Sequence, residues 1–444
     1  MNWFPESETP GMTSMPSKIL LVGGGGREDA VARKIVESGS ELYSALKNRN
    51  PSIISLSRET LITDELNHQA ILEFALAKGV DLAFIGPDPV LDTPLADTLL
   101  SRGIRVASPS RLAARIETSK AYMRELLSRY EIQGNLEYHE VKSVKELETL
   151  ILDSTAEYAI KPTGLTGGKG VRVMGIQIDT RREAFQYARE ILERDGMVLL
   201  EEKISGEEFS QMVFTDGTHM APMPMAQDFK RAFEGDKGPN TGGMGSITDA
   251  DHLLPFIDSG TRERALQIIA SVINAMRSEG NEFRGIMYGQ FMKTSRGPKV
   301  VEINARFADP EGINVLSISS GNFTEMLYSI ADGSLRKSVS FRNSATVLKY
   351  VVPVGYGIDP RPGKLEIDKN FEGENLKIYY AAVSGTRDNV IMSSSRALAV
   401  VGIADHIWDA SDTVEEGLKK IHGEYYVRHD IGTREMIQRK IRQS

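Results

Sequence analysis

A stretch rich in lysine and glycine, IKPTGLTGGKGV at residues 160–171, has the side chains and backbone freedom needed to hold phosphate groups. An apolar run before it predicts a strand that delivers Lys161 outward, and four glycines follow within residues 164–170. Glycines let successive backbone N–H groups approach an anion, while Lys161 and Lys169 supply positive charge. Because the strand-like run VRVMGI follows at 171–176, we predict a hairpin flap over phosphates, with an ordinary flexible hairpin as the alternative.

Two common nucleotide-binding motifs do not fit the glycines of this chain. A P-loop requires G-x-x-x-x-G-K-[ST] leading into a helix, whereas Lys169 is followed by Gly170 and a β-rich run. The dinucleotide fingerprint G-x-G-x-x-G, started at Gly23, requires glycine at position 28, where this chain has Glu28. A nicotinamide cofactor is therefore the weaker interpretation of the first glycine turn.

That first glycine turn nevertheless predicts an anion site. The run KILLV at 18–22 indicates a buried strand, glycines occupy 23–26, and the helical pattern DAVARKIVESG follows. At the start of a helix, unpaired N–H groups and the helix dipole attract negative charge. We therefore expect a phosphorylated ligand to bind near this turn.

A second centre of polar residues lies on the predicted strand VVEIN, at 300–304. Side chains alternate along a strand, so Glu302 and Asn304 point to the same face. Two oxygen ligands so placed suit Mg²⁺ that is also bound by nucleotide phosphates, and Gln290 on the preceding strand is a third candidate. The alternative, a simple exposed strand face, leaves the charges of the following segment 306–311 unexplained.

A long segment at 227–246, QDFKRAFEGDKGPNTGGMGS, is dense in glycine and charged residues. Loops of this length inside a domain are uncommon and are usually functional or disordered. We interpret the segment as part of a site for an anionic substrate, with disorder as the alternative.

The elements that position these residues follow an α/β pattern in the first part of the chain. Strand signals at 18–22, 52–56 (SIISL), 81–90 and 104–108 alternate with helical stretches. This alternation predicts a doubly wound parallel sheet with ligand sites at the carboxyl ends of its strands. The last hundred residues instead indicate a small α+β unit.

Composition removes several classes of function. A net charge of −8 argues against a broad nucleic-acid-binding surface, and no run approaches the ~18 apolar residues of a membrane span. The chain has no cysteine, which excludes disulfides, thiolate nucleophiles and Cys-ligated zinc. There is no H-E-x-x-H or G-x-S-x-G motif. Residues 1–17 make a poor secretory signal, so we expect a disordered leader and a cytoplasmic protein.

Taken together, eight segments resemble the ATP-grasp enzymes and, within them, the phosphoribosylamine–glycine ligase family of purine biosynthesis. The segments appear in family order over nearly the whole chain from Lys18 onward. They are GGGGREDA (23–30), IGPDPVL (85–91), ETSKAY (117–122), IKPTGLTGGKGV (160–171), LEEKISGEEFS (200–210), QDFKRAFEGDKGPNTGGMG (227–245), EINARFADPE (302–311) and YYVRHDIG (425–432).

The resemblance implies three domains after the leader at 1–17. These are an N-terminal substrate-binding domain with a doubly wound parallel sheet at 18–116, an ATP-grasp domain at 117–340 and a C-terminal α+β domain at 341–444. The ATP-grasp domain is expected to contain a flap subdomain at about 135–202.

The resemblance also implies a reaction. ATP phosphorylates the carboxylate of glycine to glycyl phosphate, and the amine of 5-phosphoribosylamine attacks it, giving glycinamide ribonucleotide, ADP and phosphate. Such a carbon–nitrogen ligase requires ATP and Mg²⁺ or Mn²⁺. Phosphoryl transfer depends on positioning and charge neutralisation rather than on a covalent nucleophile, which agrees with a chain without cysteine. We expect small-molecule substrates only, and a monomer or weak homodimer.

The same resemblance assigns residues to roles. For ATP they are Lys120, Lys161 and the flap residues Gly164, Gly167, Gly168, Lys169 and Gly170 at the phosphates, Glu201, Glu202, Lys203 and Ile204 at the adenine, and Glu208 at the ribose. For the metal they are Gln290, Glu302 and Asn304. For the substrates they are Gly24, Gly25, Gly26, Arg27, Glu28 and Asp88 near phosphoribosylamine, with Asp228, Lys230, Asn240, Arg306 and Asp309. The expected catalytic residues are Arg306, Lys161 and Asp228.

Three departures from the family pattern bear on the amine substrate. The family usually has His at the position of Asp29, Glu at the position of Asp88, and a P-G-N-x-G segment after the second strand, where 55–61 (SLSRETL) lacks Pro, Gly and Asn. An ATP-grasp carboxylate–amine ligase for another amine is therefore the alternative. A non-catalytic nucleotide-binding protein would have lost the metal face, yet Glu302 and Asn304 are present.

Overall fold

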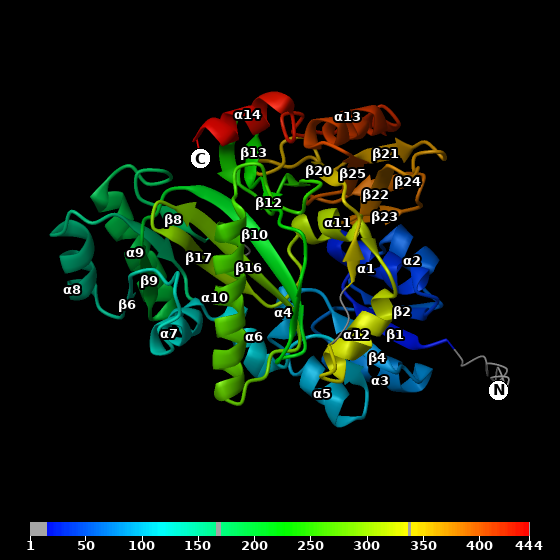
Figure 1. Cartoon of the computed structure of the whole chain (residues 1–444), viewed down its shortest axis with the longest axis horizontal. Coiled ribbons are helices and arrows are strands. Elements are labelled where there is room, and N and C mark those ends of the chain that lie inside the picture. The colour runs from blue at the N-terminus through cyan, green and yellow to red at the C-terminus, as the bar shows by residue number, and fades with distance from the viewer. Residues whose placement is uncertain (1–15, 166–169, 336–338, 444) are drawn as a thin grey trace, which may run out of the picture.

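The computed structural model describes residues 16–165, 170–335 and 339–443 of the 444-residue chain (Figure 1). The first part of the chain forms a five-stranded parallel sheet in the order β3-β2-β1-β4-β5. The parallel, doubly wound arrangement predicted from the sequence is confirmed. Its elements are β1 (Lys18–Val22), α1 (Gly26–Glu37), β2 (Glu41–Leu46), α2 (Pro51–Leu56), β3 (Glu59–Ile62), α3 (His68–Lys78), β4 (Leu82–Ile85), α4 (Asp88–Leu91), α5 (Leu95–Ser101) and β5 (Arg105–Val106).

The strand predicted at 52–56 is wrong, because this run forms helix α2. The side-chain Oδ1 of Asn50 accepts hydrogen bonds from the N–H groups of Ser52 (3.0 Å) and Ile53 (3.3 Å), and Pro51 occupies the first helical turn. The periodicity of a short apolar run fits a strand and a buried helix equally well. Here the cap by Asn50 favours the helix. The second strand is β2, and the loop that follows it is 47–50.

A four-stranded antiparallel sheet in the order β11-β10-β16-β17 forms the centre of the molecule, with α10 packed on β16 and β17 (Figure 1). The predicted partners Gln290 and Glu302 face each other directly in the β16–β17 register. The elements of this region are α6 (Arg111–Thr118), α7 (Lys120–Arg129), β10 (Glu207–Thr215), β11 (Met220–Pro222), α10 (Ser259–Ser278), β16 (Gly285–Thr294), β17 (Gly297–Asn304), α11 (Glu311–Leu316), β18 (Ser319–Ser320), α12 (Phe323–Ala331) and β19 (Ser340–Phe341).

The flap subdomain has its own sheet, β6-β9-β7-β8, and its own small hydrophobic core. β7 and β8 pair antiparallel, which confirms the hairpin, but the strand predicted at 171–176 is shorter because Gly175 adopts φ +74° and turns the chain. The elements are β6 (Tyr138–Val141), α8 (Val144–Leu147), the π-helical turn η1 (Glu148–Leu152), β7 (Tyr158–Lys161), β8 (Arg172–Val173), α9 (Arg181–Asp195) and β9 (Val198–Glu202).

The segment 227–246 is folded, so disorder is not the explanation of its composition. It contains β12 (Gln227–Asp228), the hairpin β13 (Arg231–Phe233) and β14 (Lys237–Asn240), and the start of β15 (Gly245–Thr248). β12 and β15 join the C-terminal strands in the sheet β12-β15-β20-β25-β22. The C-terminal part therefore packs directly against this segment.

The C-terminal part is the predicted α+β unit. It combines the sheet just described with a second antiparallel sheet, β23-β24-β21-β26. Its elements are β20 (Ala345–Val351), β21 (Lys364–Ile367), β22 (Leu376–Tyr380), β23 (Val383–Gly385), β24 (Asn389–Met392), β25 (Leu398–Ala404), α13 (Ile407–Leu418), β26 (Ile421–Gly423) and α14 (Arg434–Gln443). None of the helices in the described ranges is long and apolar enough to cross a membrane.

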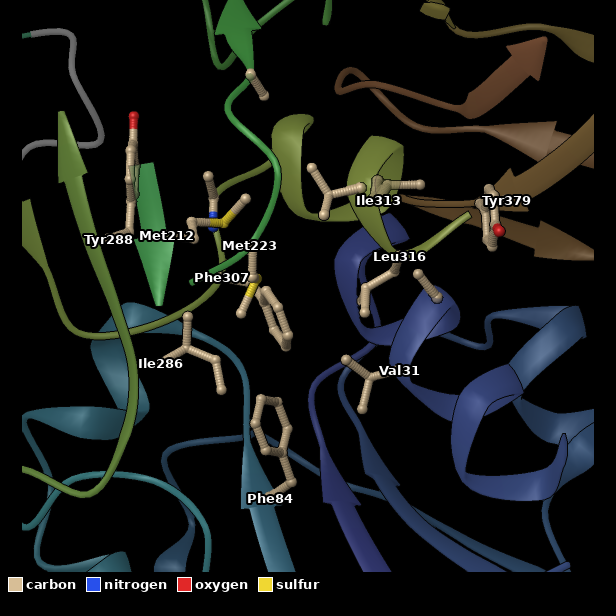
Figure 2. Packing of buried hydrophobic residues seen from close by; sticks show 14 of the residues in the cluster. Val31, Phe84, Met212, Met223, Ile286, Tyr288, Phe307, Ile313, Leu316 and Tyr379 are labelled. Carbon is tan, nitrogen blue, oxygen red and sulfur yellow. The ribbon is translucent and has the colours of Figure 1, made fainter. Parts of the chain in front are cut away.

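Phe307 joins the N-terminal and central sheets in the main hydrophobic core. Its ring lies 6.0 Å from the ring of Phe84 on β4 and 6.0 Å from the ring of Phe214 on β10. Figure 2 shows Phe307 above Phe84, with Val31 of α1 across the same core. The burial of this phenylalanine fixes the backbone on both sides of it, which carries Arg306 and Asp309.

Candidate active site

A cleft of about 500 Å³ lies between the flap sheet and the central sheet, closed on one side by residues 227–242. It collects predicted side chains from five separate stretches of the chain. Those that line it are Lys161, Glu201, Glu202, Lys203, Ile204, Glu208, Asp228, Lys230, Asn240, Gln290, Glu302, Arg306 and Asp309.

Part of the cleft lining is apolar. Leu136, Ala159, Ile204, Met292 and Val301 are among the lining residues. Apolar walls accept the flat face of a nucleobase. Ile204 belongs to the segment 201–204 that is predicted to contact adenine.

Glu201 is the buried centre of an ion-pair cluster. Its carboxylate accepts two hydrogen bonds from Arg124 (2.8 and 2.9 Å) and pairs with Nζ of Lys161 at 2.6 Å. Although burial alone would raise the pKa of Glu201, Arg124 and Lys161 lower it to about 2. Lys161 is therefore buried, and the prediction that it points outward is wrong, because Glu201 lies on the same face of the neighbouring strand β9.

Arg124 is a site residue that the sequence reasoning missed. It is fully buried on α7, and it also donates to the backbone oxygen of Val300 at 2.9 Å. The sequence pattern that could have indicated its burial is the position of this arginine between the apolar residues Met123 and Leu127 on the buried face of α7.

The structure places the predicted metal ligands Gln290, Glu302 and Asn304 close to one another. Asn304 donates to Oε1 of Glu302 at 3.3 Å, and the Nε2 of Gln290 donates to Glu208 at 2.8 Å, which leaves its carbonyl oxygen available. Among the residues that the structure describes, no group of three or more His, Asp or Glu side chains could hold a metal. One carboxylate with amide oxygens fits Mg²⁺, which takes few protein ligands when phosphates complete its shell.

Asp228 and Lys230 lie opposite that face. Lys230 donates to Glu208 at 3.0 Å, whereas Oδ1 of Asp228 is buried without a hydrogen-bond partner in the part of the chain that the structure describes. Burial, and next the charge of Glu311, raise the pKa of Asp228 well above its usual range. A cationic group entering the cleft would pair with this carboxylate and reverse that shift.

Arg306 connects the cleft to the N-terminal domain. Its guanidinium pairs with Asp88 at 2.9 Å and with Glu117 at 2.9 Å, and Arg27 approaches Asp88 at 3.5 Å. Burial raises the pKa of Glu117 to about 7, whereas at Asp88 the charges of Arg306 and Arg27 outweigh burial and lower the pKa to about 2. Glu117 was not among the predicted site residues, although it lies three residues before Lys120 in the segment ETSKAY.

Asp309 is held from the C-terminal domain. Its carboxylate accepts a hydrogen bond from the hydroxyl of Tyr350 at 2.7 Å and pairs with Arg396 at 3.1 Å. The Arg396 guanidinium in turn lies 4.5 Å from the centre of the Tyr350 ring. Neither partner could be paired with Asp309 from the sequence, because both lie at least 40 residues away along the chain.

Comparison with known proteins agrees with this geometry. Models of the N domain, the ATP-grasp (A) domain and the C domain of phosphoribosylglycinamide synthetase match residues 17–117, 118–312 and 346–434. Phosphoribosylamine–glycine ligases of Pyrococcus horikoshii and Methanoregula boonei are 45% and 46% identical over 426 residues, which is 96% of this chain and 96% and 98% of theirs.

The chain belongs to the phosphoribosylglycinamide synthetase family. As a member it is an ATP-dependent ligase, and the predicted fold class is confirmed. The crystal structure of a phosphoribosylamine–glycine ligase from Thermotoga maritima is similar, with a TM-score of 0.79 at 24% identity over 93% of this chain and 99% of that one. A biotin carboxylase from Campylobacter jejuni shares the fold, with a TM-score of 0.74 at 15% identity over 95% of each chain.

The first glycine turn does not form the open anion site that we predicted. The N–H of Gly25 donates to Oε2 of Glu28 at 2.9 Å, so the helix carries its own carboxylate at its start, and Arg27 donates to the other oxygen at 2.9 Å. The residues 24–28 do not line the cleft. Residues 24–28 are connected to the cleft indirectly, because Arg27 contacts Asp88 and Asp88 pairs with Arg306.

Two of the departures from the family pattern have structural explanations. Asp29 accepts a hydrogen bond from the backbone N–H of Tyr380 at 2.7 Å and lies 3.6 Å from Arg33, so it joins α1 to the C-terminal domain. The segment that follows the second strand is 47–50 rather than 55–61, and it does contain asparagines. Asn50 donates to the carbonyl oxygen of Gly24 at 3.0 Å.

The remaining predicted residues lie beside the cleft or outside the described ranges. Nζ of Lys120 donates to the carbonyl oxygen of Gly164 at 2.7 Å, which ties α7 to the base of the flap, and burial lowers the pKa of this lysine. Asn304 and Gly170 are close in sequence to lining residues but do not line the cleft themselves. Gly167, Gly168 and Lys169 lie outside the residues that the structure describes.

Proposed function

We propose that this chain joins glycine to 5-phosphoribosylamine at the expense of ATP, forming glycinamide ribonucleotide, ADP and phosphate. The observation that carries the proposal is the cleft itself. It brings apolar side chains, Glu302 and Asp228, whose Oδ1 has no hydrogen-bond partner in the described structure, together around one volume. Relatives named for this reaction match 96% of the chain.

In this proposal the nucleotide lies between the two sheets. Its adenine lies against the apolar lining beside Ile204, and its ribose lies near Glu208. Glu302, Asn304 and Gln290 hold Mg²⁺ or Mn²⁺ with the phosphates, and the metal supplies charge neutralisation when it is bound. Lys161 and Lys120 supply the neighbouring positive charge.

Glycine enters as a zwitterion, and we assign each of its charges to a different part of the cleft. We assign its ammonium group to Asp228, whose Oδ1 is buried and unpartnered in the described structure, and its carboxylate to the side of Arg306. An oxygen of that carboxylate attacks the γ-phosphorus, ADP leaves, and glycyl phosphate forms. The amine of phosphoribosylamine then attacks the acyl carbon, loses a proton, and inorganic phosphate leaves.

The amine substrate is assigned to the N-terminal side of Arg306. Asp88 lies there, in contact with both Arg306 and Arg27, and Arg27 donates to Glu28, which also accepts from the N–H of Gly25 in the glycine turn. This arrangement supports phosphoribosylamine over a different amine, because the departure at Asp29 concerns a contact between domains.

We also propose the domain division 18–116, 117–340 and 341–444 after a leader at 1–17, with a flap subdomain at about 135–202. The start at residue 18 and the boundary at 116/117 are supported by the family models, which match 17–117 and 118–312. The pairing of β15 with β20 means that the last two domains share a sheet. We further propose a cytoplasmic monomer or weak homodimer without nucleic-acid or membrane partners.

A coupled assay of ADP release tests the substrate assignment. ATP, glycine and enzymatically generated phosphoribosylamine together should yield ADP, phosphate and glycinamide ribonucleotide, and omission of any one should stop product formation. The same assay over a panel of amines supplies the control. Activity with another amine, with phosphoribosylamine inert, would establish the alternative ligase instead.

The glycine assignment has its own test. Asp228→Asn removes the charge that pairs with the ammonium group while keeping the side-chain volume, so we expect the KM for glycine to rise about tenfold or more with little change in the KM for ATP. Equal loss for both substrates would contradict the assignment.

A further inference from the structure

The last helix of the chain reaches the cleft from outside the matched family model, which ends at residue 434. α14 is at the red end of the chain in Figure 1, and its Arg439 lies 3.8 Å from Asp236 in the turn between β13 and β14. Its buried residues Met436 and Ile437 anchor it, and Lys440 is among the residues that line the cleft. Nζ of Lys440 donates to Oε2 of Glu207 at 2.9 Å, and both side chains are mostly buried, at 11% and 17% exposure.

The environment of Lys440 fixes where its ammonium group can lie. The nitrogen is 5.7 Å from the centre of the Phe229 ring and 5.5 Å from that of Phe256. Aromatic faces attract a cation and at the same time restrict the stem that carries it. Lys440 therefore has a defined place at the edge of the cleft rather than a solvated one.

Glu207 connects Lys440 to the segment 227–230, which carries Asp228 and Lys230. Its Oε2 also accepts a hydrogen bond from Nε2 of Gln227 at 3.3 Å, and the same amide donates to the carbonyl oxygen of Glu208 at 2.7 Å. Along the extended segment 227–230, side chains alternate in direction. Gln227 and Phe229 contact Glu207 and Lys440, whereas the charges of Asp228 and Lys230 interact with Glu208.

A second set of contacts ties the same C-terminal segment to the hairpin β13–β14. Arg428 is fully buried, pairs with Asp236 at 3.0 Å and donates to the carbonyl oxygen of Arg231 at 3.1 Å. The N–H of Gly235 donates to Asp430 at 3.0 Å. The hairpin carries Asn240, which lines the cleft. The C-terminal segment therefore contacts both the β13–β14 hairpin and, through Glu207, the segment 227–230.

We propose that Lys440 is a positioning residue for the glycine side of the site. This proposal rests on the proposed function. Lys440 acts through Glu207 and Gln227 to hold the segment 227–230 so that Asp228 and Lys230 face the cleft. The ammonium group of Lys440 contacts neither the nucleotide nor glycine; its effect passes through the strand.

Steady-state kinetics of three variants test this role. Lys440→Met keeps an apolar stem between the two aromatic rings but removes the hydrogen bond to Glu207, so the KM for glycine should rise about tenfold with the KM for ATP within twofold. Lys440→Arg should restore most of the loss. The control Arg442→Met, an exposed position on the same helix, should match the wild type.

The path through Glu207 is tested by a double-mutant cycle. Glu207→Gln should give a similar rise in the glycine KM, and adding Lys440→Met to it should produce less than the product of the two single effects. Multiplicative effects, or a rise confined to the KM for ATP, would overturn the proposal. If Lys440→Met strongly lowers the melting temperature, the glycine KM of Glu207→Gln tests the proposal instead, because this variant removes the other partner of the same hydrogen bond.

Hydrogen exchange measured without substrates separates this inference from the proposed function. Peptides spanning 227–241 should exchange faster in Lys440→Met than in the wild type and in Arg442→Met. Unchanged exchange with unchanged kinetics would overturn the positioning role. An enzyme that is inactive with glycine but shows the exchange difference would refute only the proposed substrate.

Discussion

Buried charges at single residues define most of the chemistry of the cleft. Glu201 lies between Arg124 and Lys161, and Arg306 lies between Asp88 and Glu117, each inside the protein with short contacts. A buried ion pair is costly to break, because removing one partner leaves an uncompensated charge. Such groups fix the positions of their neighbours as much as they act on a ligand.

We predict that Glu201→Gln destabilises the fold by about 3–5 kcal/mol, because Arg124 and Lys161 lose their common counter-charge. Urea unfolding measures this. The control Glu193→Gln removes the exposed partner of Arg189 and should cost less than about 0.5 kcal/mol. A loss at Glu201 no larger than at Glu193 would mean that the cluster contributes no stability.

The pH dependence of the same residue follows from its lowered pKa. Glu201 has a pKa of about 2 in the folded chain against an ordinary value of 4.5, so the unfolded chain binds more protons between these values. Its contribution is present above pH 4.5 and is lost as the pH falls towards 2. Unfolding free energies of the wild type should therefore decline more steeply over this range than those of Glu201→Gln.

We predict that Glu302→Gln keeps the fold but lowers turnover on the order of 10²-fold or more, because it removes the only carboxylate of the metal face. ADP release at saturating ATP and Mg²⁺ measures this, with thermal unfolding as the check on folding. Turnover near that of the wild type would remove Glu302 from the metal site.

At the scale of elements, the β7–β8 hairpin is the part of the site most open to change. β8 has only two residues, and the flap sheet has a hydrophobic core separate from the main one. The base of the hairpin is tied to α7 by Lys120, which donates to the carbonyl oxygens of Gly164 and Thr163, and to α9 by Tyr187, whose hydroxyl donates to Gly170. Short strand pairing allows an element to respond to a ligand.

We predict that an ATP analogue slows backbone hydrogen exchange in peptides spanning 162–171, because phosphates would bind this glycine-rich connection. Peptides from α10, packed on the other face of the central sheet, are the internal control and should change little. Exchange in 162–171 that is unaffected by the analogue would count against a lid function.

At the scale of the whole molecule, Asn50 joins three parts of the fold. Its Nδ2 donates to Gly24 at 3.0 Å and to Tyr380 of the C-terminal domain at 2.7 Å, while its Oδ1 caps α2. Asn50→Ala leaves these buried groups unpaired, and we predict a loss of about 3 kcal/mol in urea unfolding. Asn67→Ala, at the exposed cap of α3, should cost only about 1 kcal/mol.

The sequence by itself determined the fold class, the β7–β8 hairpin and most of the residues that line the cleft. These features depend on local patterns: β/α alternation, glycines beside lysines, and two side chains such as Glu302 and Asn304 on one strand face. The wrong prediction of a strand at 52–56 was also a local matter, because the conformation of this run depends on whether the side chain of Asn50 caps a helix.

Only the tertiary structure decided which charges meet. Arg124 with Glu201, Arg306 with Asp88, and Lys440 with Glu207 are separated by 77, 218 and 233 residues along the chain. A buried charge is stable only beside its partner, but the partner can come from any element that packs there. That choice is made by the packing of the sheets, and no spacing within the sequence records it.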